Sequence, residues 1–277
     1  NQGRQVADLW PIILRDKVFI AFAHKTIKWS NLASQKATVV VNILGLATTS
    51  RKRTIFEGET AMNVDTISPY LIANSETIVS ASSETLSELD KMNFGSMPND
   101  GGHLVLTHSE KNEAIKKYGV KEKFIKRFVG SQEFIRGESR YCLWIEKSDV
   151  DAAYLNPLMA NRLKATKSHR AKSRRKTTQE LSSVPFQFGE IRNRGKERSI
   201  IIPSVSSENR PYLPCGLVEK RTIISNLAFY IETRNLEYLS VLGSKLHIVW
   251  VGAVCGRLGT GYRYSNTLGW NTFPLPN

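Results

Sequence analysis

The chain has 277 residues, a hydrophobic fraction of 41%, a charged fraction of 23% and a formal net charge of +14. This composition excludes a wholly disordered chain, because enough apolar surface can be buried to offset the entropy of ordering. No apolar run approaches the ~18 residues that a membrane-spanning helix needs, and no signal peptide is visible. We therefore expect a cytoplasmic protein with a polyanionic partner, nucleic acid first.

Three cysteines, Cys142, Cys215 and Cys255, lie far apart in the sequence. Since no CxxC pair is present, zinc ribbons and disulfide frameworks are excluded, and each cysteine is expected to be a small buried apolar side chain. The polar, turn-like start at residues 1–3 indicates a chain that begins inside a longer protein.

The first sixty residues predict an α/β arrangement. A helix is expected over residues 6–14, where Pro11 requires a place in the first turn or at a break. Residues 18–22 and 38–46 are rich in apolar and β-branched side chains and predict two buried strands. The polar residues 28–33 between them predict a turn, and hence an antiparallel pair.

A boundary between domains is expected within residues 55–105, where turn-forming residues gather, above all in the run 95–102 (GSMPNDGG). The next segment predicts a helix over residues 109–118, with Ser109 as N-cap and Gly119 just past its end. The remaining segments mix strands with helices, so the expected fold class is mixed α+β. The expected strands cover residues 141–145, 198–205 and 222–230, and the expected helices cover 149–155, 157–181, 236–242 and 245–257.

The strongest charge feature lies on the long helix expected over residues 157–181. Its basic side chains follow one another without an intervening acid: Arg162, Lys164, Lys167, Arg170, Lys172, Arg174, Arg175 and Lys176. A solvated helix face usually alternates the sign of its charges to gain i,i+4 pairs. The run therefore favours contacts with phosphates. A purely solubilising face is the alternative.

A second basic cluster is formed by Arg192, Arg194, Lys196 and Arg198, in a glycine-containing turn. Such a turn could enter a nucleic-acid groove. An ordinary exposed hairpin explains the same residues equally well.

The segment 206–212 (SSENRPY) pairs an acid with a base two residues apart. If the segment is extended, Glu208 and Arg210 point to the same side, because side chains alternate along a strand. Glutamate accepts from cytosine N4 and arginine donates to guanine O6 and N7, so the two could recognise one C·G pair. A local salt bridge is the alternative.

Several catalytic motifs are absent from the sequence. It contains no Asn/Asp-Pro-Pro-Tyr/Phe tetrapeptide, no HExxH and no GxSxG. Residues 256–261 include three glycines but follow an expected helix, so they predict a turn and not a cofactor loop. The five histidines are scattered, and no metal site is expected.

Blocks along nearly the whole chain resemble the adenine-specific methylases of the type IIL restriction-modification (MmeI-like) group. In chain order the blocks are residues 22–33 (FAHKTIKWSNLA), 96–102 (SMPNDGG), 128–135 (FVGSQEFI), 140–144 (RYCLW), 206–210 (SSENR), 253–258 (AVCGRL), 262–265 (YRYS) and 271–274 (NTFP). The resemblance implies the end of a Rossmann-like methyltransferase core over residues 1–60. It further implies an α+β target recognition domain over 61–245, then a C-terminal helix and return segment over 246–277.

The resemblance also implies a function. The full-length protein would transfer a methyl group from S-adenosylmethionine to adenine N6 in double-stranded DNA, whereas this chain would recognise the sequence, bind no cofactor and be inactive alone. A non-enzymatic DNA-binding specificity subunit is the alternative. An RNA-binding protein is a third option that no motif supports.

Roles for individual residues follow from the same resemblance. Trp29, with Lys28 and Asn31 beside it, is the candidate to stack on a flipped adenine, although a core position would also explain Trp29. The candidates for contacting bases are Glu208, Arg210, Tyr212, Arg174 and Lys176. The candidates for contacting phosphates are Arg162, Lys164, Lys167, Arg170, Lys172, Arg175, Arg192, Arg194 and Lys196.

Overall fold

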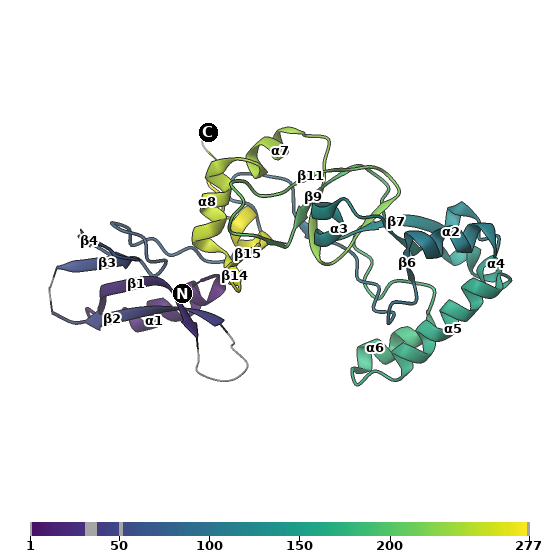
Figure 1. The fold of residues 1–277 in the computed structure, drawn as a ribbon, viewed down its shortest axis with the longest axis horizontal. Coiled ribbons are helices and arrows are strands. Elements are labelled where there is room, and N and C mark those ends of the chain that lie inside the picture. The colour runs from purple at the N-terminus through teal and green to yellow at the C-terminus, as the bar shows by residue number, and fades with distance from the viewer. Residues whose placement is uncertain (1, 31–37, 50–51, 276–277) are drawn as a thin grey trace. The chain divides into compact units, whose positions relative to one another are not determined.

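The computed structural model describes residues 2–30, 38–49 and 52–275. The chain forms two compact units, each built from separate stretches of sequence (Figure 1). Unit 1 comprises Asn1–Lys91, Val205–Leu213 and Val241–Asn277, and unit 2 comprises Met92–Ser204 and Pro214–Ser240.

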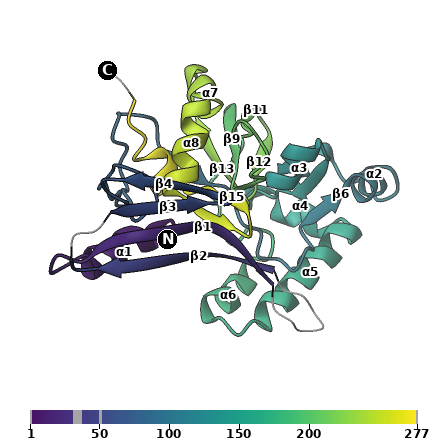
Figure 2. The same ribbon diagram turned by 60° about the vertical axis from the view of Figure 1, so that its left-hand side comes forward.

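Unit 1 begins with a helix and a four-stranded sheet in the order β2-β1-β3-β4 (Figure 2). The elements are α1 (Arg4–Ile13), β1 (Phe19–Ser30), β2 (Thr38–Ala47), β3 (Arg53–Glu57) and β4 (Thr60–Val64). Strand β1 pairs antiparallel with β2, as the sequence predicts, and parallel with β3. The buried side chains Val6 and Trp10 of α1 share a core with Ile20 and Ile55 of the sheet, which fixes the helix on one face.

Two expectations in this region are corrected. Pro11 lies inside α1, in its last turn, and not in the first turn or at a break. The missing N–H then costs one hydrogen bond, which the burial of Val6 and Trp10 offsets. Strand β1 also continues through Lys28 to Ser30, where a turn is expected, because its backbone pairs with β2 as far as Ser30↔Thr38.

The rest of unit 1 includes a small antiparallel sheet in the order β10-β15-β14. The strands of this sheet are β10 (Val205–Ser206), β14 (Gly256–Leu258) and β15 (Gly261–Arg263). Helix α8 (Lys245–Val254) precedes β14, and a π-helical turn over Asn266–Trp270 follows β15. Helix α8 therefore ends three residues before the expected limit. The segment expected to be a turn is instead part of a hairpin over residues 256–263, in which β14 and β15 are joined by a turn and Gly259 has a φ of +60°.

Unit 2 contains two four-stranded sheets, in the orders β11-β9-β13-β5 and β12-β7-β8-β6. The strands are β5 (Asn93–Phe94), β6 (Val105–Thr107), β7 (Ile125–Val129), β8 (Arg140–Leu143), β9 (Ser199–Pro203), β11 (Gly216–Val218), β12 (Thr222–Ile224) and β13 (Ala228–Glu232). The helices are α2 (His108–Lys116), η1 (Glu122–Phe124), α3 (Ser131–Arg136), η2 (Lys147–Asp149), α4 (Val150–Tyr154), α5 (Pro157–Ala171), α6 (Lys176–Glu180) and η3 (Leu181–Ser183). Helix α7 (Glu237–Leu242) contains the last crossing back to unit 1.

The main core of unit 2 lies between the β12-β7-β8-β6 sheet and helix α5. Phe128, Leu143, Met159 and Leu163 are all almost fully buried there. The mixed α+β class expected from the sequence is confirmed by this arrangement. No helix in the described part of the chain is both long and apolar enough to span a bilayer.

Local interactions correct several predicted element limits in unit 2. Helix α2 begins at His108, because Thr107 and not Ser109 accepts the backbone N–H of Glu110 and forms a capping box with it. The strand expected over 222–230 is divided into β12 and β13, since Ser225 turns the chain and accepts the backbone N–H of Ala228. The strand expected over 198–205 is likewise divided, and its two parts belong to different units.

Candidate nucleic-acid interface

Helix α5 presents one face to the core of unit 2 and another to solvent. It begins at Pro157, where the side chain of Asn156 accepts the backbone N–H groups of Leu158 and Met159. Its buried residues, listed from the N-terminal end, are Met159, Leu163, Thr166 and Arg170. Their spacings of four, three and four residues define a single helical face. The lysines Lys164 and Lys167 lie outside that face and are exposed.

The helix predicted over residues 157–181 is interrupted. Helix α5 ends at Ala171, and α6 begins at Lys176. Ser173 stabilises the intervening turn, because its hydroxyl accepts the N–H of Arg175 at 3.2 Å and its carbonyl accepts Nε2 of Gln179 at 2.7 Å. The break redirects the second half of the basic run.

Arg162 is engaged inside unit 2, which argues against the phosphate contact predicted for it. Its Nη1 donates to the carbonyls of His103 (2.9 Å) and Val105 (3.1 Å), and its Nη2 pairs with Glu110. Hydrogen bonds from Thr107 and Arg162 hold the pKa of Glu110 below its usual value despite partial burial. The guanidinium therefore ties α5 to β6 and α2.

For Arg170 the structure contradicts the predicted phosphate contact. The residue is fully buried. Its five N–H groups donate to five backbone carbonyls: those of Pro98, Asn99, Leu181, Val184 and Gln187. An arginine has five donors in all, so none is left for a phosphate.

Six exposed cations remain, and we call them the α5–α6 basic segment: Lys164, Lys167, Lys172, Arg174, Arg175 and Lys176. Among the residues that the structure describes, no carboxylate lies within salt-bridge distance of any of them. Like charges so close together repel one another, and an approaching polyanion relieves the repulsion. The segment has the charge distribution of a phosphate-binding surface.

The second basic cluster is largely neutralised within unit 2. Arg192 pairs with Glu190, and Arg194 lies 3.9 Å from Glu146. Arg198 pairs with Glu219 at 3.1 Å. Lys196 is exposed on the same turn. Phosphates that bind here would have to compete with the carboxylates that already pair with these arginines, which makes this cluster the weaker of the two surfaces.

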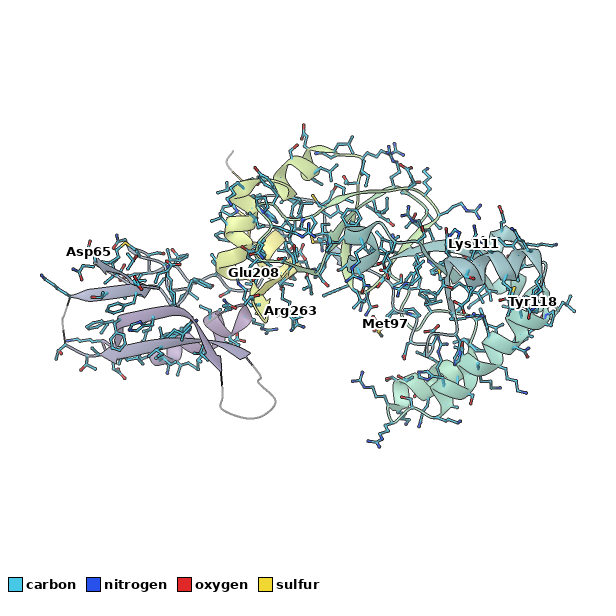
Figure 3. All side chains as sticks on the ribbon, viewed as in Figure 1. Asp65, Met97, Lys111, Tyr118, Glu208 and Arg263 are labelled. Carbon is cyan, nitrogen blue, oxygen red and sulfur yellow. The ribbon has the colours of Figure 1, made fainter. Side chains whose placement is uncertain are left out.

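The segment around Glu208 and Arg210 is a turn, so the condition under which both side chains would point to one side, an extended backbone, is not met. The N–H of Arg210 donates to the carbonyl of Ser207 at 3.3 Å, and the N–H of Asn209 donates to the Ser207 hydroxyl at 3.2 Å. Figure 3 labels Glu208 on this turn and Arg263 on strand β15 of the same unit. Glu208 and Arg210 are therefore presented by a turn and not by alternation along a strand.

The turn is nevertheless an exposed and anchored surface. Glu208, Arg210 and Tyr212 are all exposed. Ser206 on one side belongs to β10, and Leu213 on the other is almost completely buried. The turn belongs to unit 1, whereas the α5–α6 basic segment belongs to unit 2.

The candidates for stacking on a flipped base lie at the end of β1. Lys28 and Trp29 are strand residues whose backbones pair with β2, and Asn31 lies outside the described residues. Their roles stay predictions.

Sites for metals and reactive thiols are not found in the described part of the chain. No group of three or more histidine, cysteine and acidic side chains could hold a metal ion there. Burial raises the pKa of Cys215 to about 11 and that of Cys255 to about 12. It also raises the pKa of the fully buried Cys142. The thiols therefore stay protonated near neutral pH.

The sequence reasoning missed that Arg170 and the loop at residues 96–99 act together. A usable signal was present, since Arg170 continues the spacing of Met159, Leu163 and Thr166 and so falls on the buried face of α5. A basic residue at such a position must find internal acceptors.

Comparisons with known proteins agree along the whole chain. The family model "MmeI, target recognition domain" matches residues 73–277, and "MmeI, DNA-methyltransferase domain" matches residues 1–57. "DNA methyltransferase A" of Bacillus subtilis (strain 168) is 43% identical over 278 residues, which cover 100% of this chain and 32% of that protein. The solved structure of the type IIL restriction-modification enzyme MmeI in complex with DNA is 36% identical, with a TM-score of 0.93, over 100% of this chain and 38% of that chain.

The chain thus spans about a third of the length of these relatives. The matched regions lie in the order methyltransferase domain, then target recognition domain. On this evidence the chain belongs to the MmeI family of restriction-modification methyltransferases, and most of it is a target recognition domain.

Proposed function

We propose that this chain is the DNA sequence-recognition portion of an S-adenosylmethionine-dependent adenine-N6 DNA methyltransferase. The observation that carries the proposal is the α5–α6 basic segment, whose exposed cations have no internal carboxylate partners among the described residues, in a chain of this family. Such a segment gains most from a partner with regularly spaced phosphates, and DNA is that partner. In this proposal residues 1–60 are the end of the methyltransferase core, residues 61–245 are the target recognition domain, and residues 246–277 are a C-terminal helix and return segment.

Two kinds of contact are proposed. Phosphates are bound by exposed cations: Lys164, Lys167, Lys172, Arg175, Arg192, Arg194 and Lys196. Bases are recognised by Glu208, Arg210, Tyr212, Arg174 and Lys176. Phosphate contacts position the duplex without selecting a sequence, so specificity rests on the second group.

The cofactor belongs to the full-length protein in this proposal. The glycines of residues 256–261 belong to a hairpin over residues 256–263 and not to a cofactor loop between a strand and a helix. Trp29 remains our candidate for stacking on the flipped adenine, because an aromatic platform stabilises a base outside the duplex. The similarity of residues 1–57 to a DNA-methyltransferase domain favours this function over a non-enzymatic specificity subunit.

The experiment is a titration of a fluorescein-labelled DNA duplex with the 277-residue chain, followed by fluorescence anisotropy over a series of salt concentrations. We expect binding at low salt, with log K falling linearly against log salt because counterions are released. Absence of binding at low salt would contradict the proposal. Binding that does not depend on salt would contradict the role given to the α5–α6 basic segment.

A further inference from the structure

Arg170 closes a short loop that contains most of the α5–α6 basic segment. Its Nη1 donates to the carbonyls of Leu181 and Val184, both at 3.0 Å, and its Nη2 donates to that of Gln187 at 2.7 Å. Residues 171–180 are thereby held between the end of α5 and the chain that follows α6. Four exposed cations lie inside this closed loop: Lys172, Arg174, Arg175 and Lys176.

The same guanidinium anchors the loop to the rest of unit 2. Its Nε donates to the carbonyl of Asn99 at 2.8 Å, and its Nη2 donates to that of Pro98 at 2.9 Å. The side chain of Asn99 also donates to the hydroxyl of Thr178 on α6 at 3.2 Å. Met97, labelled in Figure 3, continues the connection through paired backbone hydrogen bonds with Glu190. Residues 97–99 therefore bind both ends of the closed loop.

This arrangement opposes the repulsion between the four cations. Like charges separated by only a few residues favour open, dispersed conformations of a loop. The guanidinium of Arg170 stabilises the closed loop, because opening the loop would leave buried N–H donors without acceptors, at a cost in free energy. Because the loop is already ordered before it binds DNA, binding does not incur the entropy cost of ordering it.

We propose that Arg170 is a positioning residue for DNA binding, which holds the cations at 172–176 in a fixed arrangement against the duplex backbone without touching DNA itself. The inference rests on the proposed function. It assigns to residues 97–99 a role in presenting the basic loop.

The test compares Arg170→Lys and Arg170→Met with a matched control, Arg162→Met. Arg162 is the other arginine of α5 that donates to backbone carbonyls, but its partners His103 and Val105 lie outside the closed loop. Each variant is first shown to be folded by circular dichroism, and DNA binding is then measured well below its melting temperature. The readouts are the affinity for a labelled duplex and the slope of log K against log salt.

We expect both Arg170 variants to lose roughly tenfold or more in affinity at moderate salt, and the slope to fall by roughly the equivalent of two phosphate contacts, ~1.8. Lysine should not rescue, because it lacks the planar fork and two of the donors. Arg162→Met should stay within about twofold of the wild-type affinity, with its slope unchanged. The closed loop keeps its hydrogen bonds to Arg170 in this variant, and the protein is folded at the temperature of the measurement.

Two results would overturn the inference while leaving the proposed function intact: wild-type affinity and slope in the folded Arg170 variants, or an equal loss in Arg162→Met. If neither Arg170 variant folds, Asn99→Ala decides, because it removes only the side-chain link to Thr178. A reduced slope in that variant supports the inference, and a wild-type slope overturns it. Failure of the wild-type chain to bind DNA would instead contradict the proposed function.

Discussion

Arginine and lysine side chains on helix α5 have different fates although they carry the same charge. Arg162 and Arg170 donate to backbone carbonyls inside unit 2, while Lys164 and Lys167 reach solvent. The planar guanidinium has enough donors to satisfy several carbonyls at once, whereas an ammonium group remains strongly hydrated. Individual burial therefore decides which members of a basic run are free to bind an anion.

Exchanging the charges of Glu208 and Arg210 should change sequence preference. In a full-length enzyme that contains this chain, we expect Glu208→Arg combined with Arg210→Glu to alter the preferred base pair at one position of the target. The reason is that carboxylate and guanidinium recognise different base edges in the major groove. Sequencing of methylated sites in DNA treated with each enzyme measures the change. An unaltered methylation pattern would indicate that the two residues serve only local structure.

His247 should make the stability of unit 1 depend on pH. Its side chain is fully buried, with Nε2 3.1 Å from the Tyr264 hydroxyl and the Phe273 ring at 4.7 Å between centroids. Burial lowers the pKa of His247 from 6.5 to about 4. The unfolded chain therefore takes up a proton before the folded chain does, so stability is complete above pH 6.5 and falls as the pH decreases towards 4.

The expected loss across that range is roughly 3 kcal/mol in the free energy of unfolding. Urea titrations between pH 4 and pH 7.5, monitored by tryptophan fluorescence, would measure it. His247→Leu is the control, since a leucine cannot be protonated and the difference between the two pH profiles isolates this residue. Parallel profiles for both proteins would contradict the prediction.

At the scale of elements, the turn between α5 and α6 matters more than helix propensity. The sequence of residues 157–181 contains no proline after position 157 and supports one long helix, yet the chain turns at 172–175. The turn is held by Ser173, by Gln179 and by the bonds from Arg170 to carbonyls beyond α6. A continuous helix would forfeit the latter bonds, so tertiary contacts outweigh local preference.

Removing charge from the α5–α6 basic segment should weaken DNA binding without changing its sequence preference. We expect the triple change Lys164→Gln, Lys167→Gln and Lys172→Gln to lower affinity for all duplexes alike and to reduce the salt slope by up to ~2.7, about 0.9 for each phosphate contact. Anisotropy titrations with several duplex sequences would test this. Lys220→Gln is a suitable control, because Lys220 is exposed but already pairs with Glu197 at 3.1 Å. A loss confined to one sequence would contradict a phosphate role.

On the scale of the whole molecule, each compact unit combines distant stretches of sequence. The stretch Val205–Leu213, with the candidate base-contacting turn, folds with unit 1 although unit 2 both precedes and follows it in the chain. The sheet β11-β9-β13-β5 brings together strands from residue 93 to residue 232. Such pairing cannot be inferred from a composition shift at a single boundary.

The chain as given should not methylate DNA. Its sequence has neither the Asn/Asp-Pro-Pro-Tyr/Phe tetrapeptide nor a glycine-rich cofactor loop. We therefore expect no transfer of label from methyl-labelled S-adenosylmethionine to duplex DNA, while the same preparation binds that DNA. A full-length MmeI-family methyltransferase serves as the positive control. Clear turnover by the isolated chain would contradict the prediction.

The sequence by itself determined those features that depend on local chemistry. The runs of apolar and β-branched residues predicted the strands β1 and β2, and the fold class followed from the mixture of elements. The Asn156-Pro157 start of helix α5 has the same local origin, since its cap lies within three residues of the groups it satisfies. The distinctive sequence blocks indicated the family, because they resemble those of the MmeI-like methylases and lie in the same order along the chain.

Only the tertiary structure decided which charged residues are free and how the candidate contacts are presented. Eight basic residues look equivalent in the sequence, but distant carbonyls take Arg162 and Arg170 out of the basic surface. The turn at Glu208 and Arg210 is formed by local hydrogen bonds to Ser207, whereas the burial of Leu213, which anchors it, comes from the tertiary structure. Hydrogen bonds between residues far apart in the chain are invisible to periodicity and spacing, and they determine here which members of the basic run remain exposed without an internal partner among the described residues.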